Sequence, residues 1–428
     1  MSDPLETIQL QQISTELKDG THGTHQRVNV GIPFLSAKNI GKNGQINWSQ
    51  EDDRISLREF ELIHSNFSLV PGDLLLTIVG SLGRAAVYRG ERVTFQRSVA
   101  YIRPNPTLVS SAFLHQAFRH PSFQRQLISR SNATAQAGLY LGELAKTEVP
   151  LFRLAEQQKI AQILDTLDTQ IQKTEALIAK LEKIKEGLLH DLLTRGVDQN
   201  GQLRPSSDQA PELYRESVLG LIPKEWKVLS AETVCEAVID CKNRTPPERM
   251  TGFPVIRTPN VRNGRFVYSD LLYTDRKSYK IWTQRGAPRP GDIVITREAP
   301  VGEVCKIPST MNQACLGQRM MMYQPDPNII DTDYMLATLV SRRVQTRLLD
   351  LAGGSTVGHV KVGDIRQLAI PTPPIDEQTL IAESFKSIES RLSNEARELE
   401  KLRLKKHGLM DDLLTGRVRV TPLLKDAV

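Results

Sequence analysis

The chain repeats its own sequence once, and this duplication constrains its fold more than any other feature. Residues 187–194 (GLLHDLLT) recur as residues 408–415 (GLMDDLLT), at an offset of 221. Residues 71–77 (PGDLLLT) recur as residues 290–296 (PGDIVIT) at nearly the same offset. Self-similarity at one fixed offset indicates repeated structural units. The 428 residues are therefore predicted to form two copies of one unit.

Each copy is predicted to contain a β-rich globular part, of the α+β class, followed by one long helix. Short apolar runs at residues 74–79, 99–103 and 293–296 indicate strands, and Asn-Gly and Pro-Gly-Asp turns separate such runs. Residues 110–129 and 333–349 are predicted to be helical.

The two long helices carry an apolar seam with the alternating three-and-four spacing of a coiled coil. A seam of about four heptads is longer than a small domain needs, so the helices are predicted to pair with each other. The alternative is that each helix packs only on its own domain. About 40 residues at 1.5 Å each form a rod roughly 60 Å long, which suits a spacer. The apolar seam residues are Leu164, Leu167, Ile171, Ile178, Leu181 and Leu188 in the first helix and Phe385, Ile388, Leu392, Leu399, Leu402 and Leu409 in the second.

Polar residues interrupt both seams at equivalent positions. Thr174 and Lys185 stand in the first seam, and Glu395 and Lys406 stand in the second. A polar group at a seam position lowers stability but fixes the register of the pair. The interruptions therefore predict one specific alignment of the helices.

Composition excludes membrane and secreted classes. Hydrophobic residues make up 39% of the chain and charged residues 24%, a mixture typical of a soluble globular protein. No apolar run approaches the roughly 20 residues that span a bilayer, and the first residues do not read as a secretory signal. Cys235, Cys241, Cys305 and Cys315 form no C-x-x-C pair and are predicted to be free thiols in a reducing cytoplasm.

The excess positive charge is confined to the globular parts. Residues 214–370 hold 22 basic and 16 acidic side chains, and residues 1–150 hold 15 and 13. The helical segments have no positive excess. This distribution is a weak indication of phosphate binding.

The sequence offers no recognisable catalytic site. It has no phosphate-binding G-x-x-x-x-G-K-[ST] loop and no dinucleotide-binding G-x-G-x-x-G motif after a strand. The motif that an adenine methyltransferase uses to hold a flipped base is also missing. His22 and His25 could form a metal pair, but they lie in a Gly/Thr-rich loop with no evident third ligand. A role in holding the loop is favoured, and no catalytic residue, metal or cofactor is predicted for this chain.

The order of these features resembles the DNA-specificity subunit of type I restriction–modification enzymes. The features are Val149-Pro150 with Glu156-Gln157 before the first helix, an Ile-Pro-Lys-Glu-Trp segment at residues 222–226, and Ile370-Pro371 with Glu377-Gln378 before the second helix. The resemblance covers essentially the whole chain.

The resemblance implies a non-catalytic protein that reads double-stranded DNA. Its two target-recognition domains each read one half of a split, asymmetric site, and its two helices pair antiparallel as a coiled coil. The helices dock two methyltransferase subunits, on which S-adenosylmethionine is expected to bind, and motor-nuclease subunits complete the complex. The implied organisation is a first target-recognition domain at 1–150, a central helix at 151–197, a linker at 198–213, a second target-recognition domain at 214–370, a distal helix at 371–416 and a tail at 417–428.

Candidate DNA contacts are basic and amide side chains in loops beside the repeated motifs. Arg and Lys are expected to contact guanine, and Asn is expected to contact adenine. An ordinary solvated charge is the alternative for each residue, and Arg97 and Arg319 could instead be partners of Asp73 and Asp292. The candidates are Lys38, Asn39, Arg84 and Arg97 in the first copy and Arg257, Asn260, Arg297 and Arg319 in the second.

Three further residues are given structural roles. Trp226 is predicted to anchor a core. Gln157 and Gln378, at the helix starts, are predicted to cap the helices and dock them on their domains.

A different class of function stays open, namely a coiled-coil adaptor that joins proteins and never touches DNA. An adaptor would have no reason to concentrate Lys and Arg in its globular parts. The charge distribution therefore favours the DNA reader.

Overall fold

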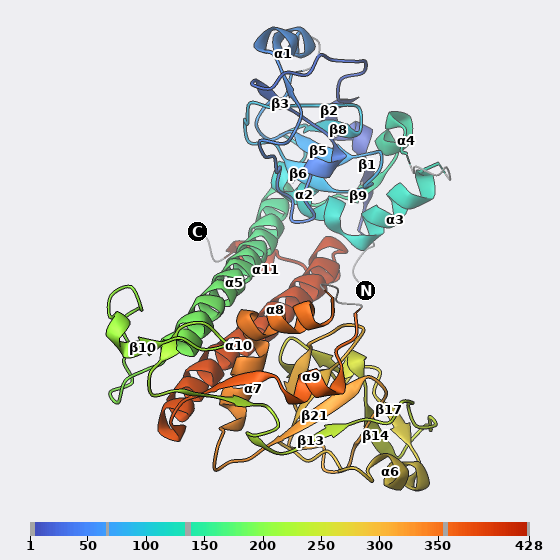
Figure 1. The fold of residues 1–428 in the computed structure, drawn as a ribbon. Helices are drawn as coiled ribbons and strands as arrows, with labels where there is room; N and C mark the ends of the chain where they lie inside the picture. Colours follow the sequence, from blue (N-terminus) through green and yellow to red (C-terminus); the bar gives the residue numbers. More distant parts are fainter. Residues whose placement is uncertain (1–4, 66–67, 133–137, 354–357, 426–428) are drawn as a thin grey trace. The chain divides into compact units, whose positions relative to one another are not determined.

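The structure is a computed structural model that describes residues 5–65, 68–132, 138–353 and 358–425 and divides into two compact units. Unit 1 consists of Met1–Glu175 and Glu398–Val428, and unit 2 consists of Ala176–Arg397. The two long helices, α5 (Leu154–Thr194) and α10 (Ile375–Leu414), each give one half to either unit (Figure 1). Among the described helices, none is long and apolar enough to cross a membrane.

Unit 1 contains one antiparallel and one mixed sheet, with helices packed beside them. Its four-stranded antiparallel sheet has the order β2-β8-β5-β6, and its three-stranded sheet has the order β4-β3-β7. The strands are β1 (Thr7–Gln9), β2 (Ser14–Asp19), β3 (Ile32–Leu35), β4 (Arg54–Ile55), β5 (Leu74–Thr77), β6 (Ala85–Val87), β7 (Thr94–Phe95), β8 (Val99–Pro104) and β9 (Glu148–Pro150); the helices before α5 are α1 (Leu57–His64), α2 (Ser111–Arg119), α3 (Pro121–Arg130) and α4 (Leu141–Ala145).

Unit 2 repeats this topology. Its sheets have the orders β13-β21-β18-β19 and β17-β14-β20, and β12 pairs with β22 as β1 pairs with β9. The strands are β10 (Tyr214–Arg215), β11 (Ile222–Pro223), β12 (Lys227–Ser230), β13 (Cys235–Asp240), β14 (Phe253–Ile256), β15 (Val261–Arg262), β16 (Arg265–Phe266), β17 (Leu272–Thr274), β18 (Ile293–Thr296), β19 (Val304–Lys306), β20 (Cys315–Leu316), β21 (Met320–Pro325) and β22 (Ala369–Thr372); the helices are α6 (Arg276–Trp282), α7 (Thr332–Val340), α8 (Arg342–Leu351) and α9 (Val362–Arg366), and the short α11 (Pro422–Lys425) belongs to unit 1. The matching strand orders confirm the duplicated fold.

Each segment predicted as one helix after the sheet is in fact two helices. His120 separates α2 from α3 and has extended backbone, with ψ 141°. Pro121 follows it, and a proline disfavours helical backbone in the residue before it. Ser341 breaks the equivalent pair, α7 and α8, with ψ 145°. The chain turns a corner at this position in both units.

The long helices pair within each unit, as their seams predict. Unit 1 combines the first half of α5 with the second half of α10, and unit 2 combines the other two halves, so the pairing is antiparallel. None of the predicted seam side chains is exposed. The most deeply buried of them are Leu164, Leu167, Leu181, Phe385 and Leu392, each at most 5% exposed.

The two lysines that interrupt the seams form ion pairs across them. In unit 2, Lys185 contacts Glu389, and in unit 1, Lys406 contacts Asp168. These pairs are equivalent, since both their lysines and their carboxylates are 221 residues apart. Arg119 also binds Asp168, at 2.7 Å. The buried charges therefore meet their partners in only one register of the helices.

A buried glutamine joins the start of each long helix to its domain. The Gln157 side-chain oxygen accepts a hydrogen bond from the Ser110 backbone N–H at 2.9 Å, and its amide nitrogen donates to two backbone carbonyls. Gln378 repeats this arrangement with the Asp331 N–H, at 2.8 Å. The predicted docking role of the two glutamines is confirmed.

The glutamate before each of these glutamines binds the segment that follows the partner helix. In unit 2, Glu377 accepts hydrogen bonds from Arg204 and from the Trp226 indole N–H, the latter at 3.2 Å. In unit 1, Glu156 accepts from Arg419 at 2.9 Å. Trp226 is 1% exposed, which confirms its role as a core anchor.

We expect the variant Lys406→Met to lower the free energy of unfolding by about 3 kcal/mol, because it leaves the Asp168 carboxylate with one cation fewer in a buried site. Urea unfolding followed by circular dichroism measures this loss. Lys405→Met is the matched control, since Lys405 is exposed one residue away. An equal loss in both variants would contradict the interpretation.

The same loss should depend on pH. Burial alone would raise the pKa of Asp168, but the Arg119 charge and the Lys406 ammonium outweigh it and hold the pKa below its ordinary 3.8. A lowered carboxyl pKa stabilises the fold above the unfolded pKa, and this contribution disappears as the pH falls through the folded value. The difference between wild type and Lys406→Met should therefore shrink as the pH falls below about 4.

Candidate DNA interface

The predicted contact residues of unit 1 gather around the loop after β3. Lys38 is exposed and its ammonium lies 2.9 Å from the Asp52 carboxylate. Its hydrogen bond lowers the pKa of Asp52 to about 2, with help from Asn39. Arg84 is half-buried, and its guanidinium donates to the Ile40 carbonyl at 3.3 Å. The Arg84 guanidinium therefore reaches the same short segment that carries Lys38.

The two predicted asparagines hold loops together. The Asn39 side-chain oxygen accepts from the Ser36 N–H at 2.9 Å, and its amide nitrogen donates to Asn47 and Asp52. Asn260 is fully buried and has the same bonding pattern in unit 2. Both amide N–H groups of each side chain are engaged within the chain. Neither asparagine has an N–H left for an adenine base.

Arg97 is the candidate with the freest side chain in unit 1. It is exposed, and its guanidinium makes no hydrogen bond or ion pair with any residue the structure describes. Its backbone N–H donates to the Thr21 carbonyl at 3.1 Å, so it stands beside the loop that carries His22. A guanidinium in this state is available to a phosphate or a base.

The three arginine candidates of unit 2 are partly engaged. Arg297 is 9% exposed and lies 3.7 Å from the Asp240 carboxylate. Arg319 is exposed and pairs with Glu298 at 3.0 Å, while its carbonyl accepts from the Arg297 backbone N–H. Arg257 donates to a backbone carbonyl at 2.7 Å. The exposed Arg319 is therefore the most accessible of the three.

The alternative partners considered for Arg97 and Arg319 are wrong. Asp73 binds Arg103, with two contacts of 2.9 Å. Asp292 accepts from the Gln324 side chain at 2.8 Å. The two buried carboxylates thus bind side chains of the neighbouring strands β8 and β21.

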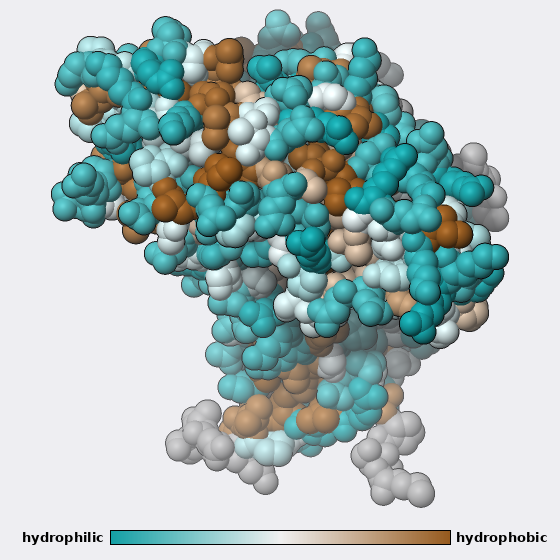
Figure 2. All heavy atoms as spheres, turned by 60° about the horizontal axis from the view of Figure 1, so that its bottom comes forward, coloured by the Kyte–Doolittle hydropathy of each residue, from teal (hydrophilic) through white to brown (hydrophobic). Residues whose placement is uncertain are grey.

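Sequence reasoning missed a basic cluster around Trp282, at the end of α6. The Lys242 ammonium and the Arg244 guanidinium lie 5.8 and 5.4 Å from the centre of the indole ring. The indole N–H donates to the Arg244 carbonyl at 2.8 Å, and Arg285 pairs with Asp240 at 3.4 Å. In the sequence, the only indication of this cluster is the group of basic residues in and beside α6. Figure 2 shows unit 2 turned forward, with hydrophilic residues over most of this face.

The equivalent loop of unit 1 is built from histidines. His22 contacts Asp19 at 2.7 Å, and His25 lies between Glu59, at 2.6 Å, and the Thr21 hydroxyl, at 2.8 Å. They line a cavity of about 320 Å³. Among the described residues, no group of three His, Cys, Asp or Glu is placed to hold a metal ion. The geometry supports the loop-holding role of the histidines.

The four cysteines are buried free thiols. Burial raises the pKa of Cys305 and Cys315 to about 12. A thiol with so high a pKa is a poor nucleophile near neutral pH.

Comparison with known proteins identifies relatives that cover the whole chain. Residues 10–183 and 223–404 match the family described as the type I restriction modification DNA specificity domain. A Methanocaldococcus jannaschii protein, proposed to be the MjaX specificity subunit of a type I restriction enzyme, is 24% identical over 97% of this chain and 94% of its own length.

Two solved structures share the fold. The S subunit of a type I restriction–modification system from M. genitalium has a TM-score of 0.61 at 13% identity, with 97% of each chain covered. A chain from a study of complex assembly in the type I R-M system has a TM-score of 0.54 at 16% identity, covering 98% of this chain and 99% of its own.

We expect Arg244→Ala to weaken binding to random duplex DNA and to reduce the dependence of log affinity on log salt by about 0.9 for each phosphate that the variant no longer neutralises. Lys361→Ala is the control, because Lys361 is an exposed cation of unit 2 at the start of α9. A salt titration of the assembled complex measures both slopes. Equal slopes for Arg244→Ala and wild type would exclude the Trp282 cluster from the interface.

Proposed function

Because this chain belongs to the type I restriction–modification DNA specificity family, we propose that it reads the two halves of a bipartite, asymmetric DNA site. The chain is the DNA-recognition subunit of such an enzyme, assembles with methyltransferase subunits and is itself non-catalytic. The resemblance stated from the sequence is thereby confirmed. The proposal adds that each unit recognises one half of the DNA site.

The observation that carries the proposal is that the two units share one fold but have different side chains in equivalent loops. Unit 1 and unit 2 have the same strand orders. At the equivalent loops, however, unit 1 has His22 and His25 beside carboxylates, whereas unit 2 has Lys242 and Arg244 around an indole. Loops of different charge and donor pattern recognise different base edges. We therefore expect two unlike half-sites.

Within each unit, the exposed arginine just before β8 or β21 is the proposed guanine contact. Arg97 serves in unit 1 and Arg319 in unit 2, because an arginine can donate two hydrogen bonds to one guanine. Lys38, Arg84, Arg257 and Arg297 are proposed to support the loops or to contact phosphates. Asn39 and Asn260 are proposed to shape the loops from within.

The duplicated helices are proposed to dock two methyltransferase subunits. Each unit exposes a large apolar side chain on its helix pair, Leu404 in unit 1 at 65% and Ile184 in unit 2 at 45%. Exposed apolar groups on an otherwise polar helix face suit a protein partner. S-adenosylmethionine would bind the methyltransferases, motor-nuclease subunits would complete the complex, and the cytoplasm is the expected location.

The adaptor alternative is less well supported. A protein adaptor needs no cations around a partly exposed aromatic ring, whereas a DNA-binding surface uses both for phosphates and bases. The Trp282 cluster and the exposed Arg97 therefore favour DNA contact.

The proposal is tested by co-expressing the chain with its companion methyltransferase in a methylation-free host and mapping N6-methyladenine across the genome. We expect a split motif of two short half-sites with a fixed gap. Methylation at a single contiguous motif would refute the two-reader arrangement, and an absence of methylation would favour the adaptor.

An exchange experiment assigns the half-sites. Replacing residues 1–150 with the same region of a relative should change one half of the methylated motif and leave the other half and the gap unchanged. A change in both halves, or in neither, would contradict the assignment of one half-site to each unit.

A further inference from the structure

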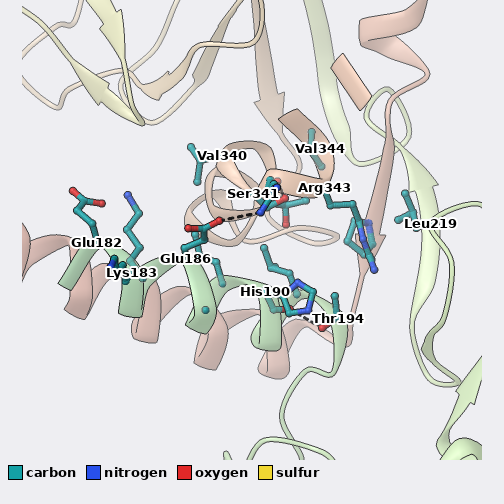
Figure 3. A pocket seen from close by; sticks show the side chains of 17 residues that line it. Glu182, Lys183, Glu186, His190, Thr194, Leu219, Val340, Ser341, Arg343 and Val344 are labelled. Carbon is teal, nitrogen blue, oxygen red and sulfur yellow. Dashed lines mark hydrogen bonds and ion pairs between the residues drawn. The ribbon is translucent and has the colours of Figure 1, made fainter. Parts of the chain in front are cut away.

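Unit 2 contains a cavity whose lining includes none of the candidate DNA contacts. It has a volume of about 710 Å³ and lies between the second half of α5 and the corner where α7 meets α8. Figure 3 shows Glu186 and His190 of α5 facing Ser341 and Arg343 of the corner. Leu189, Leu193, Val344 and Pro371 supply buried apolar lining. Charged side chains line it as well, among them Glu182, Lys183 and Lys185. A cavity of several hundred Å³ that combines apolar walls with polar groups is typical of a small-molecule site.

Arg343 is the lining residue that indicates a ligand. Its guanidinium is half-buried, its Nη1 atom is inaccessible to solvent, and it makes no hydrogen bond or ion pair with any residue the structure describes. Burial lowers the pKa of this arginine, as expected for a cation without a counter-charge. Its neighbour Arg342 is exposed and does have a partner, Glu186, at 3.5 Å. A half-buried cation without an anion is partly desolvated without compensation, so a bound anion would stabilise it.

The equivalent place in unit 1 is constructed differently. Residues 120 and 122, a buried histidine and a serine, stand where unit 2 has Ser341 and Arg343. The His120 ring lies 3.7 Å from the Asp411 carboxylate of α10, and the Phe118 and Phe123 rings stack at 4.3 Å. Unit 1 therefore has a serine in place of this arginine, and its corner is occupied by aromatic rings.

This difference between the two units indicates which kind of ligand the cavity binds. Partners that dock on both repeats need a surface that both repeats have. Unit 1 also has a cavity at its helix pair, lined by Arg403, Lys406, His407 and Met410, the equivalents of Glu182, Lys185, Glu186 and Leu189, but a serine stands in place of Arg343. A partner that makes the same contacts on both repeats therefore cannot use Arg343 in both, whereas a ligand specific to unit 2 can use it.

We propose that this cavity binds a small organic acid, with its carboxylate on the Arg343 guanidinium and its apolar or aromatic body against Leu189, Leu193 and Val344. The guanidinium can donate two parallel hydrogen bonds to a carboxylate. Because the acid would contact both α5 and the α7–α8 corner, its binding would hold the helix and the recognition domain of unit 2 together.

The proposal is tested with 2-naphthoate and its neutral isostere 2-naphthamide, titrated by calorimetry into the purified complex of this chain with its methyltransferase. We expect one naphthoate per specificity chain and binding of the amide at least tenfold weaker. Arg343→Gln should weaken naphthoate at least tenfold and remove the preference over the amide. Arg347→Gln, at an exposed arginine one turn further along α8 that does not line the cavity, should leave both affinities unchanged.

A second pair of variants uses the sequence repeat as its control. Gly187 lines the cavity from α5, and a side chain added there meets no atom within 4 Å. Gly187→Leu should therefore fill the cavity and abolish binding of both probes, and it should favour the helix because glycine is a poor helix former. Gly408→Leu, the equivalent change on α10, also meets no atom within 4 Å and should leave binding unchanged.

Folding of the variants is checked by thermal unfolding. Arg343→Gln removes a half-buried charge and should not lower the melting temperature. Equal binding of the acid and the amide, normal naphthoate binding by folded Arg343→Gln, or no binding to the methyltransferase complex would each overturn the proposal.

Discussion

The ion pairs between a seam lysine and a carboxylate of the opposite helix constrain the rest of the structure. Lys185 with Glu389 and Lys406 with Asp168 lie among apolar side chains, where a charge without its partner is costly. A slip of either helix would separate both charges of a pair, whereas leucines alone would tolerate several registers. The pairs therefore determine which residues of α5 and α10 lie side by side. The contacts that Glu156 and Glu377 make with the segment after the partner helix depend on that alignment.

Two adjacent side chains transmit this alignment to the domains. At the start of each long helix, a buried glutamine binds the helix's own domain, and the glutamate before it binds the segment that leaves the partner helix. Gln378 and Glu377 serve unit 2, and Gln157 and Glu156 serve unit 1. Because the bonds are buried and involve backbone groups, they hold both the position and the direction of the helix. The Glu-Gln dipeptide thus joins the helix start, the helix's own domain and the segment after the partner helix in each unit.

The sequence predicted what local periodicity controls and failed where distant residues decide. The repeat, the paired helices and strands such as β5 and β18 follow from spacing and turn residues, and the structure has them. The sequence did not show that Asn39 and Asn260 bond within their own loops, because amides in short loops bind their own backbone. The Trp282 cluster could not be predicted, since it unites residues 242–244 with a ring about 40 positions away. Likewise, the partner of Asp73 is determined by sheet pairing that brings Arg103 beside it.

The division of the helices between the units also determines the order in which a ribosome can complete them. Unit 2 is one continuous stretch that ends at Arg397, whereas unit 1 needs residues of α10 that begin at Glu398. Its first 175 residues must therefore wait while 222 more are made, for about 10–45 s at ordinary elongation rates. During that time Asp168 lacks Lys406, and the apolar seam around Leu164 lacks its cover. The half of the molecule that is translated first is thus the last to finish folding.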